Sequence, residues 1–179
     1  MCGPVLSLPD PYPRTTFKEA GMDTISRFLC DDHHACDAAF GAAEAAVGAD
    51  QWEIAAARFA EFFDALERHL AREEQILFPR FEERTGERAG PTQVMRAEHE
   101  QMRELLNRLE GMVRAQEGDA FLNHCDTLFT LIQQHNLKEE QILYPALDMV
   151  LKKERGALLE AMQRISAPRS SPVAATGVG

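Results

Sequence analysis

Two eleven-residue stretches of the chain combine histidine and glutamate in the same order. Residues 69–79 read HLAREEQILFP and residues 135–145 read HNLKEEQILYP, so seven of the eleven positions are identical. The offset of 66 residues that relates the two stretches also relates His33 to His99. Imidazole and carboxylate groups are common metal ligands in proteins. A repeat that preserves both groups predicts a metal site.

The apolar residues around these histidines follow the same repeat. They recur every three or four positions, which is the spacing of one face of an amphipathic helix. One such face contains Leu29, His33, Cys36 and Phe40, and its counterpart 66 residues later contains Met95, His99, Met102 and Leu106. We therefore expect two copies of a helix pair.

The periodicity predicts four long helices and a short C-terminal helix. The long helices cover about residues 24–47, 50–79, 91–116 and 120–144, and the short one ends near residue 165. Asp50 and Glu53 form a D-x-x-E pattern that predicts the start of the second helix. Pro79 and Pro145 should kink or stop their helices, because proline has no amide N–H.

Short loops between long helices make consecutive helices antiparallel. The predicted fold is therefore all-α, an up-down-up-down four-helix bundle with an internal two-fold repeat, a short C-terminal helix and disordered tails. Residues 1–22 are rich in proline and predict an extended N-terminal arm, while residues 23–166 form the bundle. Residues 167–179 predict a disordered tail.

Six ligand groups should meet inside this bundle. Each copy of the repeat supplies one histidine from its first helix. Its second helix supplies a histidine and a glutamate four residues apart, which project from one face. The six residues are His33, His69, Glu73, His99, His135 and Glu139.

This ligand set is larger than a single tetrahedral zinc ion can use. The two glutamates arrive from opposite helices, so each can bridge a pair of ions. Imidazole and carboxylate ligands with open positions suit non-haem iron or manganese. We expect two iron ions, with water, hydroxide or oxo as a further bridge. A structural role without metal is disfavoured, because buried carboxylates are costly unless paired or metal-bound, and no Lys or Arg lies on the inward faces.

Four nearby residues are alternatives to this set. His34 is adjacent to His33, but only His33 obeys the 66-residue repeat and shares the apolar face. Glu74 and Glu140 lie about 100° around the helix from the predicted ligands, so we expect them on the solvated face. His124 is expected at the surface.

Composition excludes several classes of partner. The chain has 179 residues, 45 % of them hydrophobic, which is enough for one globular domain with a sizeable core. Its formal net charge of −10 argues against nucleic acid and an anionic membrane as partners. No apolar run is long enough to span a bilayer, and the N-terminus does not have the pattern of a secretory signal. We expect a cytoplasmic protein.

The cysteines show no metal-binding or redox spacing. Cys36 and Cys125 lie on inward helix faces, where a free cysteine serves as a small core residue. A redox role for Cys36, one turn from His33, is the alternative. The other two cysteines are Cys2 and Cys30.

The combined motifs resemble the hemerythrin-like, or HHE cation-binding, family. The matching pieces are Asp32-His33, His69-x-x-x-Glu73 followed by Leu77-Phe78-Pro79, Glu98-His99, and His135-x-x-x-Glu139 followed by Leu143-Tyr144-Pro145. The resemblance covers roughly residues 24–150. Oxygen-carrying hemerythrins have a fifth histidine four residues after the one that corresponds to His99, where this chain has Arg103.

The resemblance implies a four-helix bundle that holds a non-haem di-iron centre. The four histidines would be terminal ligands, and Glu73 and Glu139 would bridge the irons. The implied function is to bind or sense O2 or NO, or to handle iron under oxidative or nitrosative stress. The alternatives are an enzyme that reduces NO or peroxide, or donates iron for cluster repair, with a protein reductant as partner, and a structural zinc or manganese site.

Overall fold

The computed structural model describes residues 24–166, and the predicted arm (residues 1–22) and tail (residues 167–179) lie outside the described residues. The elements are α1 (Ile25–Gly48), α2 (Trp52–Arg72), η1 (Glu73–Leu77), α3 (Phe78–Thr85), α4 (Pro91–Ala115), α5 (Gly118–Lys138), η2 (Glu139–Leu143), α6 (Tyr144–Val150) and α7 (Arg155–Gln163). Within this range every regular element is a helix, which confirms the all-α class.

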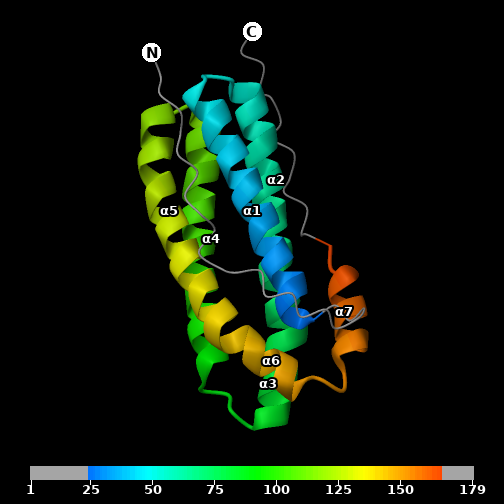
Figure 1. Cartoon of the computed structure of the whole chain (residues 1–179). Coiled ribbons are helices and arrows are strands. Elements are labelled where there is room, and N and C mark those ends of the chain that lie inside the picture. Colours follow the sequence, from blue (N-terminus) through cyan, green and yellow to red (C-terminus); the bar gives the residue numbers. More distant parts are fainter. Residues whose placement is uncertain (1–23, 167–179) are drawn as a thin grey trace, which may run out of the picture.

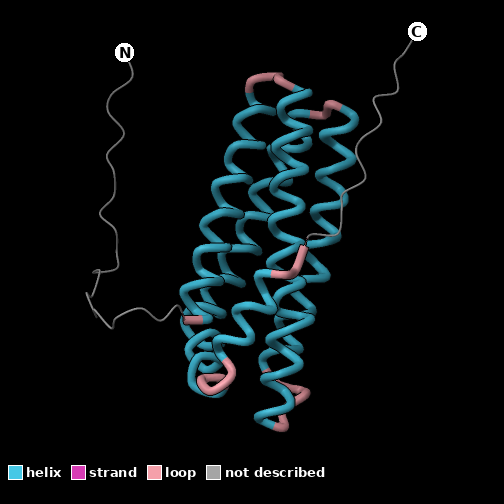
Figure 2. The backbone as a smooth tube through the Cα atoms, turned by 90° about the vertical axis from the view of Figure 1, so that its right-hand side faces the viewer, coloured by secondary structure: helices cyan, strands magenta, loops and turns pink. Residues whose placement is uncertain are grey.

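Four long helices lie side by side, and each contacts two of the others (Figure 1). Helix α1 packs against α2 and α5, and α4 packs against α2 and α5. The buried positions of each helix are spaced by three or four residues, as the amphipathic pattern predicts. The predicted short C-terminal helix is α7, which contacts α1 and η1. The loops join the helices at the ends of the structure (Figure 2).

The turn between α1 and α2 differs from the prediction. Asp50 does not cap the second helix, which begins at Trp52 after Gln51. It has a left-handed φ of 55°, and its N–H bonds to the carbonyl of Val47 at 2.9 Å. Asp50 therefore closes the C-terminal turn of α1, a place where aspartate tolerates positive φ.

Neither proline stops its helix. Each lies in the first two positions of a new α-helical segment, α3 or α6, where a missing N–H costs little. The turns before them are the π-helical segments η1 and η2, in which the N–H of Phe78 bonds to Glu73 and that of Tyr144 to Glu139, five residues back. The helix path therefore continues through a widened turn. Such turns often occur at functional sites.

Two apolar clusters fill the interior. The large cluster includes Phe40, Phe62, Leu106 and Leu128 and lies among the four long helices. The small cluster includes Leu29, Phe78, Met95, Leu143 and Leu147 and is completed by α3, α6 and α7. Each inward histidine lies between members of the two clusters, either on α1 or α4 or along the continuous paths from α2 to η1 and from α5 to η2. The four histidines therefore form a polar layer enclosed by apolar side chains.

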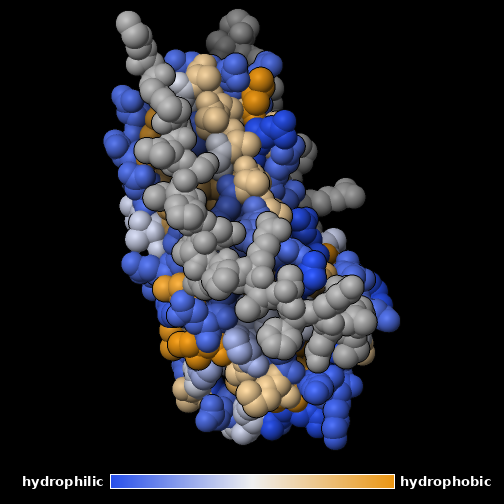
Figure 3. Space-filling view, viewed as in Figure 1, coloured by the Kyte–Doolittle hydropathy of each residue, from blue (hydrophilic) through white to orange (hydrophobic). Residues whose placement is uncertain are grey.

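The face of the molecule seen in Figure 3 is mainly hydrophilic where it is described, with small apolar areas. Over residues 24–166, no helix has the length and hydrophobicity needed to cross a membrane.

Candidate metal centre

The structure brings all six predicted ligands together in one buried layer, which we call the metal layer. Each of the six residues is at most 3 % exposed. The histidines come from α1, α2, α4 and α5, and the two glutamates are the first residues of η1 and η2. The metal layer consists of His33, His69, Glu73, His99, His135 and Glu139.

The four histidines form two pairs, and each pair has its Nε2 atoms face to face. In one half of the layer the Nε2 atoms of His33 and His69 are 3.1 Å apart. In the other half the Nε2 atoms of His99 and His135 are 3.2 Å apart. The two imidazole rings of each pair meet edge to face. The 66-residue repeat of the sequence therefore becomes two like half-sites.

Each glutamate reaches histidines of both halves. Glu73 lies 3.3 Å from Nε2 of His99 and 3.7 Å from Nε2 of His69. Glu139 lies 3.0 Å from Nε2 of His135 and 3.3 Å from Nε2 of His33. Two ligand atoms about 2.1 Å from one ion lie about 3.0–3.4 Å apart at right or tetrahedral angles. Three of these four distances fit a shared ion, and the fourth is slightly longer.

Carboxylates outside the metal layer fix the orientation of the imidazole rings. Nδ1 of His33 donates to Glu140 at 2.7 Å, Nδ1 of His99 to Glu74 at 2.7 Å, and Nδ1 of His135 to Glu98 at 2.8 Å. Nδ1 of His69 lies 3.5 Å from Asp32, the same arrangement at a longer distance. We call Asp32, Glu74, Glu98 and Glu140 the outer carboxylates.

The outer carboxylates correct one expectation. Glu74 and Glu140 are not simply solvated, because each accepts a hydrogen bond from a histidine on a neighbouring helix. A rotation of about 100° turns a side chain to the flank of its helix, and here a histidine of the neighbouring helix lies on that flank. Glu98, next to His99 in the regular helix α4, likewise bonds to His135. The sequence carried the signal, since the repeat preserves both glutamates.

Basic side chains balance the outer carboxylates, not the inner ones. Arg72 pairs with Asp32, and Lys138, its counterpart in the repeat, pairs with Glu98. Arg103 donates to Glu74 at 2.8 and 3.0 Å.

The protons on the histidine Nδ1 atoms leave the interior of the metal layer rich in lone pairs and negative charge. A carboxylate can only accept, so an imidazole bonded through Nδ1 carries its proton there and presents a lone pair at Nε2. Lone pairs of paired Nε2 atoms repel at about 3 Å unless a cation or a further proton lies between them. Among the described residues, the buried atoms without a partner include Oε2 of Glu73, Oε1 of Glu139 and Nδ1 of His69. Metal ions between the paired Nε2 atoms would satisfy the two carboxylate oxygens, whereas Nδ1 of His69 faces Asp32 at 3.5 Å on the outer side of its ring.

The electrostatics point in the same direction. Burial lowers the pKa of His33, but hydrogen bonds and charges of Glu139 and Glu140 outweigh it and raise that pKa to about 9. Burial is likewise outweighed at His99, where Glu73 and Glu74 raise the pKa to about 9. The surrounding carboxylates therefore favour a cation in each half of the metal layer.

Sequence reasoning missed one polar group in this layer, the hydroxyl of Tyr144. Tyr144 is fully buried at the start of α6. Its oxygen lies 3.0 Å from Nε2 of His33, and it is within hydrogen-bond distance of Glu73 at 2.9 Å and Glu139 at 2.8 Å. The counterpart in the repeat is Phe78, so the signal for Tyr144 was a departure from the repeat.

The alternative residues lie elsewhere. His34 is exposed, and Nδ1 of His124 donates to the carbonyl of Ala120 on its own helix. Burial raises the pKa of the Cys36 thiol to about 12, which disfavours the reactive thiolate.

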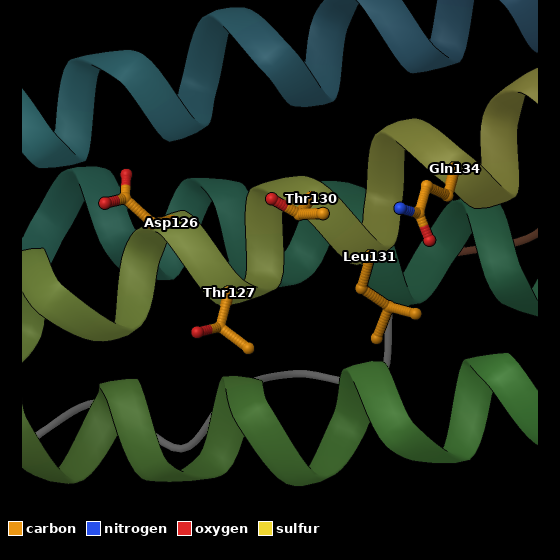
Figure 4. Close-up of a pocket in the computed structure, with 5 residues that line it drawn as sticks. All are labelled: Asp126, Thr127, Thr130, Leu131 and Gln134. Carbon is orange, nitrogen blue, oxygen red and sulfur yellow. The ribbon is translucent and has the colours of Figure 1, made fainter.

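An open depression on α5 is separate from the metal layer (Figure 4). None of the side chains that line it belongs to the metal layer or to the outer carboxylates. They are Asp126, Thr127, Thr130, Leu131 and Gln134.

Comparison with known proteins agrees with these observations. The sequence model of the hemerythrin HHE cation-binding domain matches residues 24–147, which is more than half of the chain and includes all six residues of the metal layer. No curated protein and no solved structure matches the chain. The chain therefore belongs to the hemerythrin HHE cation-binding domain family.

Proposed function

We propose that this protein binds two iron ions in the metal layer and uses them to bind or sense O2 or NO, or to handle iron under oxidative or nitrosative stress. The four histidines are the terminal ligands, Glu73 and Glu139 bridge the ions, and an oxo or hydroxo group completes the bridge. The frame is an up-down-up-down four-helix bundle, and the location is cytoplasmic.

One observation carries this proposal. Two histidine pairs face each other across two buried glutamates, and each glutamate is near histidines of both halves. Two groups of these residues each place their ligand atoms within 4.8 Å of one another, and Glu139 belongs to both groups. A shared carboxylate between two sets of nitrogen ligands supports a pair of ions rather than one.

The residues of the chain position and shield the site. The apolar clusters on both sides exclude water, which strengthens electrostatic interactions in the layer. The outer carboxylates hold each imidazole with Nε2 inward and increase its basicity as a ligand. Iron, when bound, supplies redox chemistry and open positions for a diatomic ligand.

A binding or sensing role is favoured over turnover by the groups that surround the layer. Among residues 24–166, the hydrogen-bond and ion-pair partners of the metal layer are Tyr144, the ligands themselves and the outer carboxylates. This set holds and orients ions but offers few groups to deliver protons to a substrate.

The test is metal content per chain, measured by elemental analysis on protein purified without oxygen. Absorption spectra are recorded before and after addition of O2 or NO, with zinc-substituted protein as the control. We expect two irons per chain and a spectrum that changes only in the iron protein. Zinc as the native metal, or one ion per chain without a spectral response, would contradict the proposal.

A further inference from the structure

Tyr144 and Phe78 occupy equivalent places in the two halves of the metal layer. The Tyr144 ring stacks on His33, with centroids 5.6 Å apart and planes 28° apart. The Phe78 ring stacks on His99, with centroids 5.8 Å apart and planes 22° apart. Both side chains are fully buried. The hydroxyl of Tyr144 is therefore the main chemical difference between two aromatic rings that pack in the same way.

This hydroxyl lies among acceptors that one hydrogen atom cannot satisfy. A phenol donates a single hydrogen bond, yet Nε2 of His33 and a carboxylate oxygen of each bridging glutamate lie within 3.0 Å of it. In the neutral imidazole of His33 the proton is on Nδ1, which bonds to Glu140, so Nε2 presents a lone pair to an ion. The tyrosine oxygen thus adds a further electron-rich atom to the group formed by Nε2 of His33 and the oxygens of Glu73 and Glu139.

The distances match those of ligands around one ion. The oxygen of Tyr144 is 3.0 Å from Nε2 of His33, close to the 3.1 Å that separates Nε2 of His33 from that of His69. Neighbouring ligand atoms on an ion with bonds of about 2.1 Å have separations of about 3.0 Å. The other half has no such oxygen, because Phe78 stands in the equivalent place.

We propose that the oxygen of Tyr144 is an additional ligand of the ion held by His33 and His69, so that the two iron positions have different ligand sets. The inference rests on the proposed pair of irons. The hydroxyl proton is released when the ion binds, as for any ligand that coordinates in its deprotonated form. A phenolate favours ferric over ferrous iron, so the two ions differ in their ease of reduction.

The test uses the visible spectrum of the ferric protein. A phenolate bound to ferric iron gives a charge-transfer band in the visible region, with resonance-enhanced vibrations of the tyrosine ring, and neither imidazole nor carboxylate produces these signals. The chain has two tyrosines, of which the other is Tyr12. We expect the wild type and Tyr12→Phe to show the band, and Tyr144→Phe to lose it completely while keeping two irons per chain.

The repeat provides a matched gain-of-ligand variant. Tyr144→Phe should fold, because phenylalanine already packs in the same way at position 78. In the double variant Phe78→Tyr/Tyr144→Phe, the oxygen moves to the half that contains His99 and the band returns.

The outcomes separate this inference from the proposed function. Two irons per chain without the band in the wild type, or a band that survives in Tyr144→Phe, would overturn the ligand assignment alone. Fewer than two irons in the wild type, with no band, would overturn the proposed function as well.

Discussion

The two halves of the metal layer are alike inside and different outside. In the half that contains His99, Arg103 donates to both carboxylate oxygens of Glu74, at 2.8 and 3.0 Å. It also donates to Glu67 at 3.0 Å. Burial opposes the charge on Glu74, but the hydrogen bonds from His99 and Arg103 lower its pKa to about 2. In this half the positively charged side chain of Arg103 therefore holds the outer carboxylate Glu74 in place.

In the half that contains His33, the repeat replaces the arginine with Asp37, whose partner is Gln133 at 3.3 Å. The outer carboxylate is Glu140, and its side chain is 41 % exposed, against 22 % for Glu74. This half combines a less firmly held outer carboxylate with the hydroxyl of Tyr144.

The comparison shows which parts of a duplicated site are free to differ. The residues of the metal layer cannot change in one half alone, because Glu73 and Glu139 are each near histidines of both halves. Each aromatic ring stacks on a histidine of one half, and each outer carboxylate bonds to a histidine of one half, so these groups can diverge without loss of the frame. A repeat can thus keep two like half-sites in different surroundings.

Removal of Glu73 or Glu139 should cause the largest loss of iron. The loss should be similar for the two glutamates, because each is near both halves of the metal layer. We expect Glu73→Ala and Glu139→Ala each to retain less than one iron per chain, whereas His69→Ala retains about one. At free iron about a thousandfold above its dissociation constant, each lost ion removes about 4 kcal/mol from the free energy of unfolding. Metal analysis and urea unfolding check this. Two irons in Glu73→Ala would contradict the bridging role.

The second largest expected effect is the change with pH in the free energy of unfolding of the metal-free protein. One histidine of each half contributes to it. The pKa values of His33 and His99 rise from 6.5 to about 9 on folding, so their contribution to stability is complete below pH 6.5 and is lost as pH rises through 9. Each histidine contributes at most about 1.4 kcal/mol per pH unit.

Urea unfolding with a chelator, over a pH series, measures this slope. We expect His33→Ala and His99→Ala each to remove about half of it. In the iron-loaded protein the sign should reverse, because metal ions compete with protons for the imidazoles and bind more tightly as pH rises. Stability of the metal-free protein that increases with pH would show that these imidazoles are not held protonated.

Much of the fold and of the inner site follows from the sequence. The 66-residue offset selects the six residues that lie together in the metal layer, and the spacing of apolar residues predicts the long helices. The wide turns at η1 and η2 escaped this reasoning, because hydrophobic spacing does not report whether an N–H bonds four or five residues back. Glu74 and Glu140 were misplaced for a different reason. Their histidine partners lie on other helices, and the position of a residue on its own helix does not identify the neighbour that it faces.

Removal of an outer carboxylate should weaken metal binding by a smaller amount, and by a different amount in each half of the metal layer. Loss of a group that orients a metal-bound histidine typically weakens metal binding by about 10–100-fold, or about 1.4–2.8 kcal/mol. We expect Glu74→Gln to lie near the upper limit, because it also removes one of the two carboxylates that pair with Arg103, and Glu140→Gln near the lower limit. Competition with a chelator measures both, with the exposed Glu100→Gln as the control. Equal losses would show that the arginine does not distinguish the halves.

The smallest effect is expected at His34, which lies beside His33 in the sequence but is exposed. His34→Ala should keep two irons per chain and change the free energy of unfolding by less than about 0.5 kcal/mol, as surface substitutions usually do. His33→Ala should lose the ion of its own half. The 66-residue offset selects His33 in the same way as the other proposed ligands. Loss of iron in His34→Ala, with retention of iron in His33→Ala, would therefore contradict the assignment of all six ligands.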